Sequence, residues 1–523
     1  MNDNIKNKGS FSGKALARSA VLMGVIILAS KVLGLLRDIL VASAYGTTDA
    51  AIAYATASKL PVTIFDFILG GVVTSAFIPV YNSIAVRKGK NEALSFAQSY
   101  LNLILTITTA LTVAGVLFAP TLVGWIAPDL STEAARMATE LTRIMFPMVI
   151  FVGMAFSFVG FLQSEGEYNI PALISLVSNL IMVGYLFTLN GRFGVKGLAV
   201  AMLVGWIAQA AVQIPALIKR GYRYKLTAPL ATPEIGRAAK NTLPILIATW
   251  TTPVCNLINT NLASGIEGGR AISALDYANR LYIIIVGLFS FVATNLLFPY
   301  FAKAAASGDT DESDRLTRTS IRTLIFIIAP ISVGVAVLSG GFVSIIYENG
   351  VFNSADTAIT AEALRAYSVG MIFAAVCEVL TKAFFAVEKT KIPMLSSIIS
   401  MTFNIAVVVI FGEYLGIGGI ALVSVGATAV NMAINLIFAV NKKLITPTSR
   451  DARGIAKSLI SAAVMGCAVW YVSTLTEGMG KLFGFIIPVL VGVTVYAVAA
   501  ALLGCDEMKA ILGIFKKKGK AER

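Results

Sequence analysis

The sequence predicts an all-α protein that crosses a membrane about fourteen times. Hydrophobic residues make up 57% of the 523-residue chain, charged residues make up 13%, and the mean hydropathy is +0.81. No ordinary soluble domain has this composition. Roughly fourteen stretches are each long and apolar enough to span a bilayer, and lysines and arginines gather in the short segments between them. These observations together predict a polytopic membrane protein.

The predicted spans follow one another through short connections. The first begins after a basic N-terminal stretch and has the outline of a signal peptide. Its apolar run continues from Ala20 to Ala44 without a small-residue cleavage site, so we expect a retained helix. The stretch from Gly341 to Phe352 is apolar but too short to span, and we expect it in the outer interface. The predicted spans are 16–42, 49–81, 93–125, 133–162, 170–189, 194–218, 238–264, 270–303, 316–339, 360–387, 391–412, 417–440, 453–474 and 481–504.

The charges between the spans predict the orientation. Loops on one side carry few cations and several acidic residues, which include Asp49, Asp129, Glu348 and Glu413. Loops on the other side carry most of the lysines and arginines, which is typical of the cytoplasmic side. An even number of spans returns the chain to the side on which it began, so we predict that both termini are cytoplasmic. The cytoplasmic cations are Arg87, Lys88, Lys90, Lys219, Arg220, Arg223, Lys225, Arg315, Arg318, Arg322, Lys389, Lys391, Lys442, Lys443, Arg450 and Arg453, with Lys516, Lys517, Lys518 and Lys520 in the tail.

An internal repeat is visible, because residues about 220 positions apart match in order along much of the chain. Each match alone is weak, but together they indicate the duplication of a six-helix unit. Such a unit enters the membrane the same way twice, which predicts two lobes related by a pseudo-two-fold axis along the membrane normal. The predicted domains are an N-lobe at 1–225, a C-lobe at 226–445, and two added helices with a basic tail at 446–523. The matches are Gly13-Lys14-Ala15 with Gly236-Arg237-Ala238, Lys59-Leu60 with Arg280-Leu281, Phe77-Ile78-Pro79 with Leu297-Phe298-Pro299, Glu140 and Arg143 with Glu362 and Arg365, and Ile170-Pro171 with Ile392-Pro393.

Charged residues inside the predicted spans are the strongest clue to function. Facing lipid, each would cost about 2.5–3.5 kcal/mol, so six would cost roughly 15–20 kcal/mol, more than a typical folding free energy. They must therefore pair with one another or line a wet cavity. Seven residues make nearly two helical turns, so the cation and the carboxylate on each of the first two helices share a face. The six residues are Lys31, Arg37 and Asp38 on the first helix, Lys59 and Asp66 on the second, and Arg280 on the eighth.

Two interpretations of these charges stay open. In the first interpretation, the charges form structural ion pairs, Arg37 with Asp38 and Lys59 with Asp66. In the second, they line a cavity that binds a ligand. Because the two pairs leave Lys31 and Arg280 without a carboxylate on their own helices, we expect a cationic cavity. The repeat puts Lys59 and Arg280 at equivalent positions, one in each lobe. Two such cations could face each other across the axis between the lobes and clamp a ligand. An anion with several oxygens is the natural ligand for such a clamp.

Several classes of function are excluded by what the sequence lacks. The chain has no histidine, its four cysteines show no CxxC spacing, and no GxxxxGK[ST] loop is present. We therefore expect no metal site, no cofactor and no ATP hydrolysis, and a transporter rather than an enzyme. The net charge of +14 is explained by topology signals and not by nucleic-acid binding. Glu378 and Lys382 are predicted to pair one turn apart, and the tail from Met508 to Lys518 to contact anionic membrane lipids.

Several segments at and around the charged helices form a recognisable pattern. They are Ser30 to Asp38, Tyr45-Gly46, Thr48-Asp49-Ala50, Lys59-Leu60-Pro61, Ala76 to Val80, Leu141 to Pro147, Tyr277 to Leu281 and Thr390 to Pro393. Through the first twelve helices, the sequence resembles the MurJ/MviN lipid II flippases, of the multidrug/oligosaccharidyl-lipid/polysaccharide exporter superfamily. The resemblance implies fourteen helices in two lobes, with a groove for the lipid tail formed by the last two. It further implies outward transfer of the undecaprenyl-pyrophosphate-linked peptidoglycan precursor across the bacterial cytoplasmic membrane, with cell-wall synthesis proteins as partners.

The resemblance also implies roles for single residues. Lys31, Arg37 and Arg280 match cationic positions used for the pyrophosphate, and Asp38 and Asp49 match acidic positions. With Lys59, they form the predicted substrate site.

The chain also departs from the family pattern. Phe65 and Asp66 replace a pair of arginines, and Gly70 replaces a glutamate. Some members bind sodium through acidic residues on the seventh and eleventh helices. The matching positions here are the uncharged Asn259 and Val408, with only Asn404 retained.

Membrane physics favours an anionic lipid moving outward. With a negative cytoplasm, each negative charge that leaves gains about 2.3 kcal/mol per 100 mV, enough to drive the step without ATP. Three alternatives stay open. A flippase for teichoic-acid or capsule precursors would share this chemistry. A cation-coupled multidrug antiporter should need acidic rather than basic cavity residues. A scaffold that transports nothing would tolerate the loss of every cavity charge.

Overall fold

The computed structural model describes residues 13–69, 77–226, 233, 236, 250–292, 297–307 and 309–509. Within these ranges the regular structure is helical throughout. Several features predicted from the sequence lie wholly or partly outside them: the repeat segment at Arg237-Ala238, the departure at Gly70, the basic tail from Lys516, and parts of the spans predicted at 49–81, 238–264 and 270–303. Contacts divide the chain into two compact units. Unit 1 comprises 1–41, 49–125 and 132–250, and unit 2 comprises 42–48, 126–131 and 251–523.

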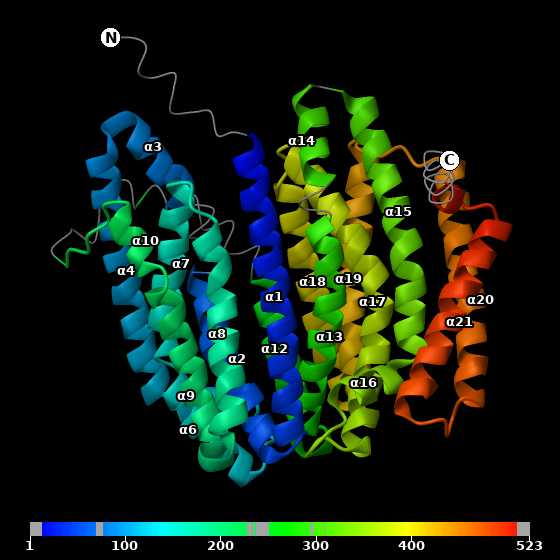
Figure 1. Cartoon of the computed structure of the whole chain (residues 1–523), viewed down its shortest axis with the longest axis horizontal. Helices are drawn as coiled ribbons and strands as arrows, with labels where there is room; N and C mark the ends of the chain where they lie inside the picture. The colour runs from blue at the N-terminus through cyan, green and yellow to red at the C-terminus, as the bar shows by residue number, and fades with distance from the viewer. Residues whose placement is uncertain are drawn as a thin grey trace. The chain divides into compact units, whose positions relative to one another are not determined.

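Unit 1 is built from the helices of the predicted N-lobe (Figure 1). A kink interrupts the span predicted at 133–162, where two helices are bent by 42°. Pro147 at this kink has no N–H to continue the helical hydrogen bonds. The adjacent Phe146 lies against Gly115, where an added Cβ would be 1.8 Å from its ring. The helices are α1 (Gly13–Tyr45), α2 (Asp49–Leu69), α3 (Ile78–Lys88), α4 (Lys90–Leu117), α5 (Ala119–Ile126), α6 (Thr132–Met145), α7 (Met148–Ser164), α8 (Asn169–Thr188), α9 (Asn190–Ala211) and α10 (Ile214–Lys219).

Unit 2 holds the remaining helices, with the last two packed on α15 (Figure 1). The segment predicted to be too short to span overlaps α16, a helix of 9 residues. Its place in the outer interface stays a prediction. The helices are α12 (Thr251–Ser264), α13 (Arg270–Val292), α14 (Phe298–Ala306), α15 (Thr310–Val337), α16 (Ser339–Tyr347), α17 (Ser354–Ala386), α18 (Lys391–Phe411), α19 (Ile417–Asn441), α20 (Ser449–Leu475) and α21 (Lys481–Leu502).

The predicted fold class is confirmed. Nine helices in the described ranges are long and apolar enough to cross a membrane, and the bent pair α6 and α7 makes ten. The count of fourteen and the symmetry of the lobes stay predictions.

Equivalent contacts in the two units support the predicted duplication. Helices α6 and α17 begin at positions 132 and 354, and α8 and α18 begin at 169 and 391, a difference of 222 each time. In unit 1, Glu140 Oε2 of α6 lies 2.6 Å from Lys196 Nζ near the start of α9. In unit 2, Glu362 Oε1 of α17 accepts a hydrogen bond at 2.9 Å from the backbone N–H of Gly418 near the start of α19. These contacts also differ by 222 positions, so each unit uses the matching glutamate to hold the matching helix.

An ionic cluster attaches the last two helices to α15. Arg322 of α15 pairs with Glu507, which follows α21, and lies 3.7 Å from Asp451 of α20. Arg318, one turn earlier on α15, pairs with the same Asp451 at 2.9 Å. Arg322 and Glu507 are both largely buried. Breaking this cluster would leave buried charges without partners, so it fixes α20 and α21 firmly against unit 2.

Candidate substrate site and apolar pocket

Arg37 lies in α1 within a network that also includes α8. Its Nε and Nη2 donate to Asp38 Oδ1 at 3.0 and 2.8 Å, and its Nη1 donates to Asn179 Oδ1 at 2.9 Å. Asn179 in turn donates from Nδ2 to the carbonyl oxygen of Ser30 at 3.1 Å. The Arg37 side chain is 22% exposed and that of Asp38 is 10% exposed. The predicted Arg37–Asp38 pair is therefore confirmed, and Asn179 is a positioning residue that the sequence analysis missed.

The two lysines of the predicted site lie on α1 and α2. Lys31 is exposed on α1, one turn and a half before Arg37. Lys59 is half-buried on α2, as is Asp66 seven residues later. The predicted Lys59–Asp66 pair stays a prediction.

Asp49 lies at the start of α2, at the opposite end of that helix from Asp66. It is the exposed first residue of α2, ten residues before Lys59, which is roughly 15 Å along a helix. A carboxylate in the first helical turn interacts favourably with the helix dipole, which gives Asp49 a structural role. The structure therefore does not bring Asp49 to the level of Lys59.

A second charged cluster lies within unit 2, next to Asp49 in sequence, and the sequence analysis did not predict it. Arg270 of α13 donates from Nη2 to Asp356 Oδ1 of α17 at 2.8 Å and from Nε to Thr47 Oγ1 at 2.9 Å. The Thr47 hydroxyl also donates to Asp356. Tyr277 donates to the carbonyl oxygen of Gly46 at 3.0 Å. These bonds anchor the segment Ala42–Thr48 to α13 and α17, and we call this set the anchor cluster.

Arg280 does have a carboxylate partner on its own helix, so one sequence-based expectation was wrong. Its Nε lies 3.1 Å from Asp276 Oδ2, four residues earlier on α13. An Asp one turn before an Arg is the favourable order for a helical ion pair. Two of the four cations of the predicted site, Arg37 and Arg280, are thus opposed by the carboxylates of Asp38 and Asp276. Each arginine of the predicted site carries its own counter-charge.

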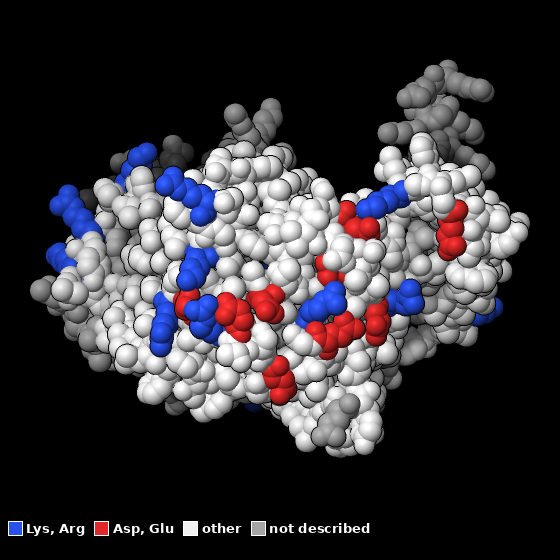
Figure 2. Space-filling model, turned by 90° about the horizontal axis from the view of Figure 1, so that it is seen from below, with Lys and Arg blue, Asp and Glu red and all other residues white. Residues whose placement is uncertain are grey.

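Charges of both signs also meet elsewhere on this protein. On the face shown in Figure 2, basic and acidic side chains lie beside one another. The predicted Glu378–Lys382 pair is among those formed, at 3.4 Å on α17.

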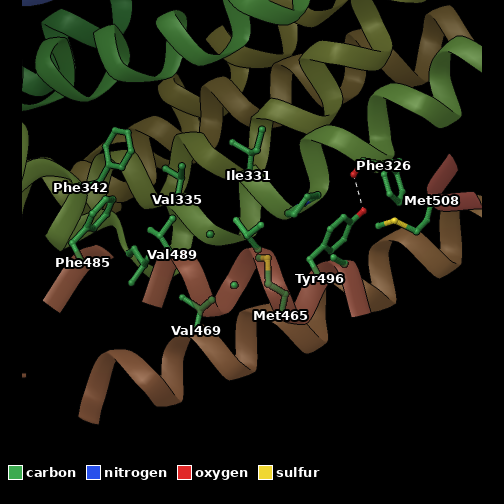
Figure 3. Close-up of a pocket in the computed structure, with 16 residues that line it drawn as sticks. Phe326, Ile331, Val335, Phe342, Met465, Val469, Phe485, Val489, Tyr496 and Met508 are labelled. Atoms are coloured by element: carbon green, nitrogen blue, oxygen red, sulfur yellow. Dashed lines mark hydrogen bonds between the residues drawn. The ribbon is translucent and has the colours of Figure 1, made fainter. Parts of the chain in front are cut away.

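An apolar pocket of about 470 Å³ lies in unit 2 between α15, α16, α20 and α21 (Figure 3). Phe326 and Val335 of α15 line one side, and Met465 of α20 and Val489 of α21 line another. The polar group of Tyr496 is satisfied, because its hydroxyl donates to the Phe326 carbonyl oxygen at 2.6 Å. The lining offers hydrocarbon contacts and suits a hydrocarbon ligand.

The positions that match the family's sodium ligands do not fit a cation. Asn259 lies on α12, and Asn404 and Val408 lie on α18, and none of them carries charge. In the described part of the chain no group of three or more His, Cys, Asp or Glu side chains gathers as metal ligands do.

Comparison with known proteins decides the family. A family model described as lipid II flippase MurJ matches residues 41–503. The chain belongs to this family. A probable lipid II flippase MurJ of Rhizobium tropici is 28% identical over 525 residues, covering 96% of this chain and 97% of the relative. A probable lipid II flippase MurJ of Bdellovibrio bacteriovorus is 27% identical, covering 95% and 97%.

Solved structures agree with the family assignment. A lipid II flippase MurJ in an inward closed conformation is similar with a TM-score of 0.80 and 25% identity, covering 92% of this chain and 98% of that one. An inward-facing multidrug resistance MATE family transporter has a TM-score of 0.68 and 16% identity, covering 81% and 98%, and shows the fold alone. The expected MurJ membership is confirmed. With its apolar helices, it makes the chain a multi-pass transport protein of the bacterial inner membrane.

Proposed function

We propose that this chain moves lipid II, the undecaprenyl-pyrophosphate-linked precursor of peptidoglycan, from the inner to the outer leaflet of the cytoplasmic membrane. The observation that carries the proposal is the match to the MurJ family model over residues 41–503. In this proposal both termini are cytoplasmic, the lobes alternate in exposure, and no covalent chemistry is performed. Membrane lipids and cell-wall synthesis proteins are its partners.

The pyrophosphate is proposed to bind Lys31, Arg37, Lys59 and Arg280, with Asp38 and Asp49 as acidic neighbours. Arg37 supports this role, because Asp38 and Asn179 hold its guanidinium in one orientation while leaving it partly exposed. A pyrophosphate oxygen would replace one charge-assisted hydrogen bond to Asp38 with another to a group that carries more negative charge. When the substrate leaves, Asp38 recovers the cation.

Arg280 and Asp276 repeat this arrangement on the other lobe. A carboxylate beside each arginine stabilises the substrate-free site and lowers its affinity for the substrate. A transporter needs both properties, since it must release its substrate in every cycle. The outward step is driven by the membrane potential, at about 2.3 kcal/mol per charge per 100 mV.

Complementation tests the site. Cells depleted of their own flippase would depend on this chain, and we expect the double variant R37A/R280A to stop growth while lipid II accumulates. The matched control is R315A, which removes an exposed arginine paired with Glu312 at 2.7 Å outside the proposed site. Immunoblots of the membrane fraction would show equal protein levels. Normal growth of R37A/R280A would disprove the site.

Two other substrates remain candidates for the same experiment. A flippase for another polyprenyl-linked glycan would accumulate a teichoic-acid or capsule precursor instead, which lipid extraction and mass spectrometry would identify. A multidrug antiporter, whose fold the MATE family shares, would export cationic drugs in an efflux assay.

A further inference from the structure

Two buried asparagines and a half-buried serine, from three helices of unit 2, come to one level. Asn259 of α12 donates from Nδ2 to Ser424 Oγ of α19 at 2.9 Å. Helices α18 and α19 run antiparallel, and Asn431 Nδ2 of α19 donates to Ser397 Oγ of α18 at 3.4 Å. Moving seven residues along each helix from that contact brings Asn404 opposite Ser424. Asn259, Asn404 and Ser424 therefore form one node, which we call the amide node.

The amide node contains hydrogen-bonding groups that have no partner in the described part of the chain. Asn404 is 0% exposed, and neither its Oδ1 nor its Nδ2 has a partner. Asn259 is 8% exposed and its Oδ1 also lacks a partner. Buried amide groups are satisfied in nearly all native proteins, by protein or by an internal water. A molecule bound at this node must accept a hydrogen bond from Asn404 Nδ2 and must also donate hydrogen bonds to the amide oxygens. A water molecule can do both.

A sodium ion would meet a different requirement. It needs only electron-pair donors, and at membrane depth it needs negative charge to offset its desolvation. The amide node has no carboxylate, and Val408, one turn beyond Asn404 on α18, supplies a hydrocarbon side chain. The Asn259 Nδ2 group meanwhile bonds directly to Ser424 and links α12 to α19 without an ion.

We infer that the amide node is an uncharged, hydrated link between α12, α18 and α19 that binds no sodium, and that lipid transfer by this chain does not draw on a sodium gradient. The binding part of this inference is independent of the substrate, and only the transport part rests on the proposed function. The absence of the two carboxylates is the cause, so supplying them should create a sodium site.

The test compares the melting temperature of the purified full-length protein in NaCl with that in KCl at equal ionic strength. A cation that binds only the folded state raises the melting temperature. We expect the wild type to melt within about 1 °C in the two salts, and N259D/V408D to melt several degrees higher in NaCl. N259D alone is the milder variant if the double variant folds poorly. N256D, one turn earlier on the exposed side of α12, is the matched control and should show no sodium effect.

The outcomes separate clearly. A wild-type melting temperature that rises in NaCl, with the rise removed by N404A, would overturn the inference. It would also be overturned if neither N259D/V408D nor N259D gained a sodium response, because the missing carboxylates would then not be the cause. In proteoliposomes carrying a membrane potential, we expect equal lipid transfer with Na⁺ or K⁺ outside. Failure of transfer in both salts would count against the proposed function, whereas transfer in Na⁺ only would count against the sodium independence.

Discussion

Removal of the Asp356 carboxylate should destabilise the protein by an amount that the anchor cluster predicts. Asp356 is nearly buried, with its side chain 4% exposed, while that of Arg270 is 35% exposed. Loss of one partner of a fully buried pair costs about 3–5 kcal/mol, and an exposed pair contributes under about 1 kcal/mol. Since the arginine left by D356N can be hydrated, we expect a loss of about 2 kcal/mol. D356A should cost about 1 kcal/mol more, because Asp356 also closes the capping box of α17 with Asn353.

Removal of Arg270 should destabilise the protein more than D356N does. R270A leaves the Asp356 charge buried without its ion-pair partner, so we expect a loss of about 3 kcal/mol. The double variant R270A/D356N should then be no less stable than R270A alone, because the charge that R270A strands is gone.

The assay is thermal melting of the purified protein in detergent, where each kcal/mol corresponds to about 2 °C for a large chain. R136A is the control, because Arg136 pairs with Glu133 on the exposed surface of α6 and its loss should not change the melting temperature measurably. Additive effects of R270A and D356N would refute the reasoning, as would a D356N protein that melts like the wild type.

Three further predictions concern other sites. N179A should slow lipid transfer without lowering the protein level, because Arg37 loses its link to α8; an unchanged rate in a proteoliposome assay would show that Asn179 positions nothing. Burial raises the pKa of Glu165, but hydrogen bonds from Tyr81 and Lys90 outweigh it and leave that pKa below its ordinary 4.5. The ionised carboxylate therefore stabilises the fold above that value, and the benefit disappears as pH falls through the lowered pKa. E165Q should melt earlier than the wild type at pH 7, and the difference should disappear once the pH lies below the lowered pKa. V335W should fill the apolar pocket and reduce transfer of a long-tailed lipid while leaving a short-tailed analogue unaffected, and equal loss for both would argue that the pocket holds no tail.

The sequence predicts helices well where apolar runs end in glycine or charge. The spans predicted at 391–412 and 417–440 match α18 and α19 to within one residue. The kink between α6 and α7 was not predicted, although Pro147 is its local signal. The mean hydropathy of a segment does not depend on whether its helix axis is straight or bent. A bend within an apolar segment therefore cannot be predicted from hydropathy.

Charge pairs were predictable only where both partners are near in sequence. Arg37 and Asp38 are adjacent, and their pair was anticipated. The Asp276–Arg280 pair has an equally local signal at four residues, which differs from the seven-residue spacing on the first two helices. The contact of Asn179 with α1 and the anchor cluster join residues more than eighty positions apart. No periodicity records such contacts, because they depend on how separate helices pack.

The first helix is shared between the two compact units. Its residues up to Val41 belong to unit 1, and the segment from Ala42 belongs to unit 2, where the anchor cluster holds it. Arg37 lies eight residues before the end of α1 at Tyr45, roughly 12 Å along one unbroken, hydrogen-bonded rod. A rod of this length transmits a push or a twist with little loss. If Arg270 and Asp356 released Thr47, the C-terminal end of α1 could move, and Arg37 would move with it. Helix α1 would then act as a mechanical lever between the anchor cluster and Arg37.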